Sequence, residues 1–239
     1  MILSNRHRFV VLAPWKTASS TTHRRLSQYN ESPYSRFFAY NPYLQRVVHQ
    51  HITYSDFMAL PESRCGYYSC AFVRNPYDRV YSGFLQLQRD MREQLDAEFP
   101  QPWIKTLVMR QIDENRTQLS AAEFDFDRWV SLIEESQIYE VGRNTSFPLH
   151  PGHYWTGTNR DVMVDFVGKT ETFERDFCVF CNRVGIEPSE RGSENVTGDI
   201  IGSEPSGSSR YVHRMSAATI SKINALFDAD FELFGYEKR

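Results

Sequence analysis

The sequence predicts one α/β domain over residues 1–239, built on an open, P-loop-like parallel β-sheet flanked by helices. Two stretches predict this class, because each runs from a short apolar strand through a polar turn into a helix. They cover residues 8–29 and residues 67–95. A chain of 239 residues is also long enough to bury a sizeable core within one domain.

In the first stretch, a hydroxyl-rich loop separates the strand from the helix. The apolar run at 9–12 predicts a buried strand, Pro14 ends it, and Lys16 opens the loop. Small or hydroxylated residues then lead into the helix: Thr17, Ala18, Ser19, Ser20, Thr21 and Thr22. Free N–H groups and the helix dipole converge at such a start, so the hydroxyls and the lysine favour a bound anion. An ordinary strand-to-helix turn with a solvated lysine is the alternative.

In the second stretch, the strand at 67–73 ends at Arg74. Asn75 is suited to cap the following helix, and Pro76 to occupy its first position. Arg74 stands at the carboxyl end of the strand, where open α/β sheets bind their ligands. Ser82 lies about two turns into the helix. The sequence alone does not show whether Ser82 meets the same ligand as Arg74.

Together these residues resemble the PAPS-dependent sulfotransferases, especially the carbohydrate (Golgi-type) branch; PAPS is 3′-phosphoadenosine 5′-phosphosulfate. In that family a Lys-Thr-x-Ser-type loop binds the 5′-phosphosulfate, and an Arg with a Ser eight residues later binds the 3′-phosphate. The loop at 16–21 and the pair Arg74 and Ser82 match both patterns. Residues 165–173 and 230–236 also resemble family segments, so the resemblance spans almost the whole chain. It implies the sulfotransferase fold, PAPS as donor and 3′,5′-ADP as product.

A pair of histidines supplies the expected base. His49 and His51 would share one face of a short strand, because side chains alternate along a strand. The segment resembles the His-x-His segment of uronyl 2-O-sulfotransferases, whose second histidine is the catalytic base, so the resemblance favours His51 over His49. Two surface histidines near a strand end are the alternative. For His150 and His153 we expect acceptor-side or structural roles.

The resemblance also implies the chemistry, which is transfer of a sulfuryl group from PAPS to an acceptor hydroxyl. Lys16 would stabilise the charge that develops on the leaving phosphate oxygen, and His51 would remove the hydroxyl proton. The loop residues 17–22 would hold the phosphosulfate, and the scheme requires no metal. In the resembled family a loop at the Gly- and Ser-rich stretch folds over the nucleotide, so the resemblance implies that Arg210 contacts phosphate or adenine, with a solvated arginine as the equal alternative. Trp15 stands where many relatives place a proline, so it either stacks on a ligand or packs.

The composition limits which ligands and partners are expected. A formal net charge of −3 leaves no overall cationic field for nucleic acid. Long sulfated glycans usually require basic grooves, so a neutral sugar, a small alcohol and a lipid-linked hydroxyl all remain open, and the resemblance favours a carbohydrate. No apolar run approaches the roughly 20 residues of a membrane helix, and Met1–Arg6 carries no signal-peptide core. We therefore expect a soluble, cytoplasmic protein, or one of the Golgi lumen if an anchor was removed; the sequence does not indicate an oligomeric state.

The sequence disfavours three other interpretations. The motif Cys178-x-x-Cys181 lies in an apolar helical stripe, which favours core packing over metal binding or a disulfide. A P-loop kinase or NTPase is disfavoured because the loop between Ala13 and Thr22 contains no glycine. A catalytically inactive PAPS- or glycan-binding module is the non-enzymatic alternative, and the intact set Lys16, Arg74, Ser82 and His51 argues against it.

Overall fold

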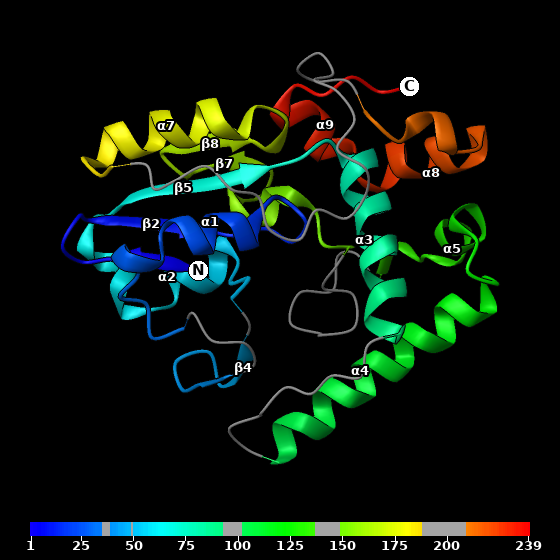
Figure 1. Ribbon diagram of the computed structural model, residues 1–239, viewed down its shortest axis with the longest axis horizontal. Coiled ribbons are helices and arrows are strands. Elements are labelled where there is room, and N and C mark those ends of the chain that lie inside the picture. Colours follow the sequence, from blue (N-terminus) through cyan, green and yellow to red (C-terminus); the bar gives the residue numbers. More distant parts are fainter. Residues whose placement is uncertain (35–38, 49, 93–101, 137–148, 188–208) are drawn as a thin grey trace. The chain divides into compact units, whose positions relative to one another are not determined.

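The computed structural model describes residues 1–34, 39–48, 50–92, 102–136, 149–187 and 209–239 (Figure 1). The chain divides into two compact units, Met1–Arg74 with Gly152–Val196 and Asn75–Pro151 with Thr197–Arg239. Each unit is described by itself, and the single domain expected from the sequence stays a prediction. Among the described residues, no helix is both long and apolar enough to cross a membrane.

A four-stranded sheet forms the centre of the first unit, in the order β1-β2-β5-β8 (Figure 1). Strands β2, β5 and β8 are parallel, and β1 runs antiparallel to β2. The bounds are Ile2–Ser4 for β1, Phe9–Leu12 for β2, Tyr68–Val73 for β5 and Phe166–Lys169 for β8. The predicted α/β class and parallel sheet are confirmed, while the edge strand β1 was not predicted.

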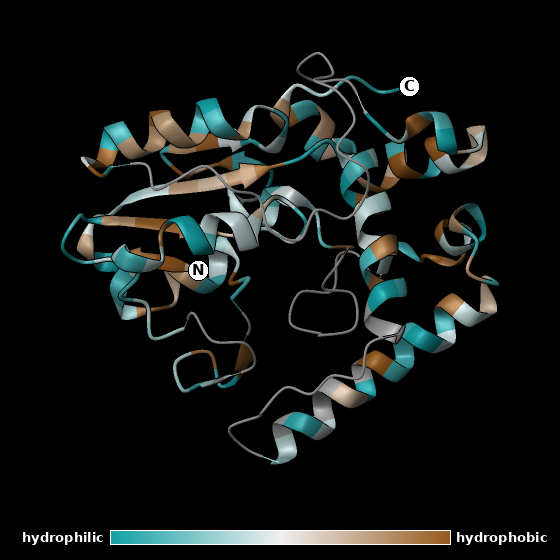
Figure 2. Ribbon diagram, viewed as in Figure 1, coloured by the Kyte–Doolittle hydropathy of each residue, from teal (hydrophilic) through white to brown (hydrophobic). Residues whose placement is uncertain are grey.

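The core of this unit lies between the sheet and helix α7, Phe173–Val184. Phe9 and Phe72 from the strands pack with Phe177 and Phe180 from the helix, and Figure 2 shows the hydrophobic residues along β2. Gly168 on β8 is required by this packing, because a Cβ there would come within 2.5 Å of the Phe72 ring. The large aromatic side chains therefore fix how closely the strands and the helix approach.

Two cysteines of this unit belong to the core, whereas Cys65 is exposed. Cys70 of β5 and Cys181 of α7 are free and buried in the core, and Cys178 is half-buried on the helix. Burial raises the pKa of the Cys181 thiol to about 12, and burial likewise raises the pKa of Cys70 well above its ordinary value. Both buried thiols therefore stay protonated and behave as small apolar side chains.

The remaining elements of the first unit are short. Residues near 47–57 are predicted to form a short strand that turns into a helix, and the structure has β4 and α2 there. Because β4 ends at Val48, His51 lies after the strand, and the expectation that it lies on a strand face is wrong. The bounds are Ser19–Arg25 for α1, Ala39–Asn41 for β3, Arg46–Val48 for β4, Tyr54–Met58 for α2, Gly157–Thr158 for β6 and Asp161–Val162 for β7. Single 3₁₀ turns occupy Ser27–Tyr29, Pro61–Cys65, Gly152–Trp155 and Thr170–Thr172.

The second unit is helical where the structure describes it. Its elements are α3 at Pro76–Arg92, α4 at Pro102–Ala121, α5 at Phe126–Leu132, a 3₁₀ turn at Val212–Arg214, α8 at Ala217–Leu226 and α9 at Asp228–Phe234. Aromatic rings of α3 and α5 pack together, with Phe84 5.4 Å from both Phe126 and Trp129 between ring centroids. The sequence predicts helices at 76–95, 100–124 and 125–133 and a last helix that begins after Ser216, and α3, α4, α5 and α8 confirm them, while α9 was not predicted. Residues 93–95 and 100–101 lie outside the described part of the chain.

A buried ion pair joins the first and last helices of this unit. Arg79 of α3 and Asp230 of α9 are 1% and 2% exposed, and Arg79 Nη2 lies 3.5 Å from Asp230 Oδ2. Arg79 Nη1 also donates to the carbonyl oxygen of His150 at 2.6 Å. The guanidinium further lies 5.1 Å from the Phe227 ring centroid. Asp230, the first residue of the closing segment 230–236, thus has a structural partner in α3.

Candidate functional site

The loop between β2 and α1 adopts a conformation that L-amino acids rarely take. Lys16 has φ 63° and Ala18 has φ 60°, both in the left-handed region. Each such residue costs about 1–2 kcal/mol in the absence of glycine. Strain of this kind persists where the surrounding structure requires it, which is common at ligand-binding sites. Alternation of left-handed and ordinary residues turns successive backbone N–H groups to one side, the geometry of an anion-binding nest.

The hydroxyls of this loop divide into two groups. Thr17 Oγ1 donates to the carbonyl oxygen of Pro14 at 2.9 Å, and Thr22 Oγ1 donates to that of Ala18 at 3.0 Å. Thr17 and Thr22 are buried, so their hydrogen bonds stabilise the loop from its interior side, and Thr21 is buried as well. Ser19 and Ser20, at the start of α1, are only half-buried. The serines are therefore better placed than the threonines to meet a ligand.

Lys16 lies beside the preceding tryptophan. Its Nζ is 5.7 Å from the centroid of the Trp15 ring, within the range of a cation–π interaction. Both side chains are half-buried. The sequence left Trp15 either stacking on a ligand or packing; in the structure its ring contacts the lysine at the head of the loop.

Arg74 meets this same loop. It follows the last residue of β5, and its Nη1 donates to the carbonyl oxygen of Lys16 at 3.3 Å. Because β2 and β5 are adjacent and parallel, their carboxyl ends lie at one edge of the sheet. Thr170, beyond the end of β8, donates to the Val73 carbonyl oxygen at 2.9 Å and joins the third strand to this edge. The structure thus brings together the two stretches that the sequence singled out separately.

His51 is fixed to the head of the loop. It lies between β4 and α2, is 6% exposed, and its Nδ1 is 2.5 Å from the carbonyl oxygen of Ala13. A carbonyl oxygen only accepts hydrogen bonds, so Nδ1 carries the proton and Nε2 keeps the lone pair of the neutral ring. The side-chain nitrogen of Gln50 lies 3.4 Å from Nε2. The contact with Ala13 selects the tautomer that a general base using Nε2 requires.

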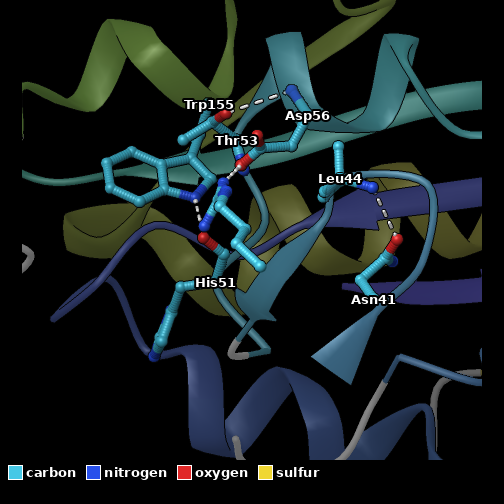
Figure 3. A network of polar contacts seen from close by, with 7 residues as sticks. Asn41, Leu44, His51, Thr53, Asp56 and Trp155 are labelled. Atoms are coloured by element: carbon cyan, nitrogen blue, oxygen red, sulfur yellow. Dashed lines mark hydrogen bonds and ion pairs between the residues drawn. The ribbon is translucent and has the colours of Figure 1, made fainter. Parts of the chain in front are cut away.

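The backbone around His51 is held by a polar network (Figure 3). Trp155 Nε1 donates to the His51 carbonyl oxygen at 3.2 Å, and Figure 3 shows the imidazole pointing away from that indole. Thr53 and Asp56 form a reciprocal capping box at the start of α2. Asp56 also accepts from Arg46 of β4 at 2.6 Å. These contacts fix the segment on both sides of the histidine.

The other predicted histidines have different surroundings. His49 lies outside the described residues. His153 is buried and makes an edge contact with Tyr154 at 5.0 Å between ring centroids. The backbone of His150, in the second unit, accepts from Arg79. These contacts show structural surroundings for His150 and His153, and any role toward an acceptor stays a prediction.

Ser82 and Arg210 belong to the second unit. Ser82 lies on α3 and is 0% exposed, while Arg210 is exposed and follows the stretch at 188–208 that lies outside the described residues. Sequence reasoning missed Asp78, a buried carboxylate in the first turn of α3 that accepts from Arg210 N at 3.1 Å. Asp78 lies four residues before Ser82, so both are on one helix face, but this spacing alone does not indicate a contact with Arg210.

The parallel sheet with a strained, lysine-bearing loop at its carboxyl edge defines an α/β protein suited to an anionic ligand. A family model described as Sulfotransferase family matches residues 1–237. The chain therefore belongs to the sulfotransferase family and is an enzyme of sulfuryl transfer to a hydroxyl-bearing acceptor. No curated protein and no solved structure matches the chain.

Proposed function

We propose that this enzyme transfers the sulfuryl group of PAPS to a hydroxyl of a carbohydrate. The observation that carries the proposal is the contact between Arg74 Nη1 and the Lys16 carbonyl oxygen at 3.3 Å. It puts a guanidinium beside an anion-binding nest that bears a lysine. PAPS carries a phosphosulfate at one position and a phosphate at another, so a donor with two anionic groups suits two neighbouring cationic sites.

Each residue of the loop has a role in this proposal. The nest N–H groups and the hydroxyls of Ser19 and Ser20 hold the 5′-phosphosulfate, while Thr17, Thr21 and Thr22 maintain the shape of the loop. Arg74 binds the 3′-phosphate, and the roles that the resemblance implies for Ser82 and Arg210 stay predictions. Lys16 donates to the bridging oxygen, which gains negative charge as its bond to sulfur breaks.

The acceptor side of the reaction uses His51. A bond forms between the acceptor oxygen and sulfur, the bond from sulfur to the bridging oxygen breaks, and 3′,5′-ADP leaves. The hydroxyl proton passes to Nε2 of His51. The hydrogen bond from Nδ1 to Ala13 supports this step, because it keeps Nε2 as the accepting nitrogen and offsets the charge that the ring acquires.

A neutral sugar is the acceptor that best fits the charge of the chain. A net charge of −3 does not favour a polyanionic glycan. Tyr40 and Tyr43 are 49% and 59% exposed on the β3–β4 hairpin that precedes His51, and their rings offer apolar faces to a sugar. A small alcohol or a lipid-linked hydroxyl would be the acceptor if no sugar is sulfated.

The test is release of 3′,5′-ADP from PAPS in the presence of a panel of neutral sugars, simple alcohols and lipid-linked hydroxyls. We expect sugar-dependent release by the wild type and a loss of about 10²–10³ in kcat for Lys16→Ala, the scale for removing one transition-state donor. Lys105→Ala, an exposed lysine on α4, is the matched control and should retain full activity. Binding of 3′,5′-ADP without transfer to any acceptor would make the chain an inactive PAPS-binding module.

A further inference from the structure

We propose that Gln50 is a positioning residue for the proton transfer, because its side-chain amide holds the Nε2 lone pair of His51 and keeps the ring neutral until an acceptor hydroxyl displaces the amide. The inference rests on the proposed function, in which His51 removes the hydroxyl proton, and it deepens that role. Gln50 and His51 both lie in the first unit, between β4 and α2.

The side-chain amide of Gln50 faces the ring nitrogen that takes the proton. Gln50 Nε2 lies 3.4 Å from His51 Nε2, and the two residues are each 6% exposed. The Nδ1 proton of His51 is donated to the Ala13 carbonyl oxygen at 2.5 Å, so Nε2 of the neutral ring can only accept a hydrogen bond. The amide N–H of Gln50 is therefore the donor in this contact.

The backbone that carries the two side chains is anchored. The carbonyl oxygen of Gln50 accepts from the Met1 nitrogen, and that of His51 accepts from Trp155 Nε1 at 3.2 Å. A side chain that extends from a fixed backbone loses less conformational freedom when it forms a bond. The amide of Gln50 is therefore pre-organised toward Nε2.

This contact favours the neutral form of the base. A hydrogen bond to the lone pair of a neutral imidazole disfavours its protonation, because a proton on Nε2 would have to displace the donor. Burial of the ring acts in the same direction. The separation of 3.4 Å is long for a hydrogen bond, so an acceptor hydroxyl can replace the amide at little cost. Gln50 thus opposes protonation of the free enzyme and still yields to the acceptor.

The elements next to this segment carry other titratable groups, namely the Met1 amine and the side chains of Lys16, His23, Arg46, Tyr54, Asp56, His153 and Tyr154. Burial lowers the pKa of the Met1 amine to about 4 and that of His23 to about 3, so both are neutral at physiological pH. Arg46 and Asp56 form an ion pair with each other at 2.6 Å. These groups are unchanged by substitution of Gln50, so a difference between variants reports the amide.

The test is NMR titration of His51 with labelled histidine in wild type, Gln50→Met and Gln50→Glu, where the His51 signal is the one absent from His51→Ala. Methionine keeps the length of glutamine and removes the N–H, so the pKa of His51 should rise by about 0.5–1 unit. Glutamate puts a carboxylate beside Nε2 and should raise that pKa by about 1–2 units.

The acidic limb of kcat/KM for sulfuryl transfer should move with the NMR value. Below the limb, activity should fall by about 3–10-fold in Gln50→Met and by about 10–100-fold in Gln50→Glu, because less of the imidazole is neutral. Above the limb, both variants should return to within about 3-fold of the wild type. A glutamine that only packed would lower activity equally at every pH.

The matched control is Gln88→Met. Gln88 Nε2 donates to the Phe124 carbonyl oxygen at 3.1 Å, so this change also removes a glutamine N–H from a hydrogen bond. It should leave the pKa of His51 and the acidic limb unaltered. If Gln50→Met does not fold, Gln50→Glu carries the test, because glutamate keeps the shape of the side chain.

The outcomes separate the inference from the proposed function. An unchanged pKa of His51 in the Gln50 variants overturns the inference, and so does a fall in Gln50→Met, which would mean that the amide accepts from the protonated ring. If the wild type transfers the sulfuryl group of PAPS, the inference then fails alone. A wild type that transfers no sulfuryl group to any acceptor overturns the proposed function and, with it, the role of Gln50.

Discussion

The buried pair Arg79–Asp230 allows a quantitative prediction of stability. In Asp230→Asn the charge of Arg79 loses its carboxylate partner at a site where both side chains are 2% exposed. Removing one partner of a buried ion pair typically costs about 3–5 kcal/mol. The separation of 3.5 Å is long for a charge-assisted bond, and Arg79 keeps its bond to the His150 carbonyl oxygen. We therefore expect the lower end, about 3 kcal/mol, which corresponds to about 6–12 °C in Tm for a chain of this size.

Urea unfolding followed by tryptophan fluorescence measures this loss. The matched control is Asp228→Asn on the same helix, because Asp228 pairs with Lys238 in an ion pair whose side chains are 44% and 43% exposed. An exposed pair contributes about 0–1 kcal/mol, so the control should be nearly neutral. Equal effects of the two variants, both below about 1 kcal/mol, would refute the argument that the Arg79 pair stabilises the helical unit.

Three further predictions concern the loop, the sheet edge and the core. Ala18→Gly should raise the free energy of unfolding by about 0.5–1 kcal/mol, because relief of left-handed strain exceeds the greater flexibility of glycine; a decrease in urea unfolding would contradict the loop geometry. Arg74→Ala should weaken 3′,5′-ADP by about 1.5–3 kcal/mol in calorimetry, and unchanged affinity in a folded variant would remove Arg74 from the site. Burial raises the pKa of the Cys181 thiol from 9.0 to about 12, so the unfolded chain loses this proton first. The free energy of unfolding should therefore fall as the pH rises between these values. In Cys181→Ala this fall should be shallower, and identical slopes for the variant and the wild type would contradict the prediction.

The local patterns predicted the elements that carry the site. Apolar runs bounded by Pro14 and by Arg74 were sufficient to predict β2 and β5, because each strand's signal lies within its own residues. The strand β1 spans only Ile2–Ser4, too short for any periodic pattern to appear. Its pairing with β2 depends on long-range contacts, which the pattern of residues within β1 does not indicate.

The features that the sequence did not predict are of two physical kinds. The pairs Arg79–Asp230 and Asp78–Arg210 join residues 151 and 132 positions apart, so no spacing within a motif predicts them. The left-handed conformation of Lys16 was also hidden, because a sequence without glycine normally argues against it. By contrast, the sequence indicated that Lys16 and Arg74 each follow a strand, and their contact arises because these strands are adjacent and parallel in the structure.

The most direct test of the central claim is transfer of label from labelled PAPS to neutral sugars, measured against pH for wild type and His51→Ala. The account predicts transfer by the wild type at a rate that rises with pH as the imidazole loses its proton. It predicts a loss of about 10²–10⁴ in kcat for His51→Ala, with 3′,5′-ADP affinity unchanged. A His51→Ala variant with the kcat and pH profile of the wild type would contradict the assignment of the base, and a wild type that binds 3′,5′-ADP but labels no hydroxyl would contradict the proposed reaction itself.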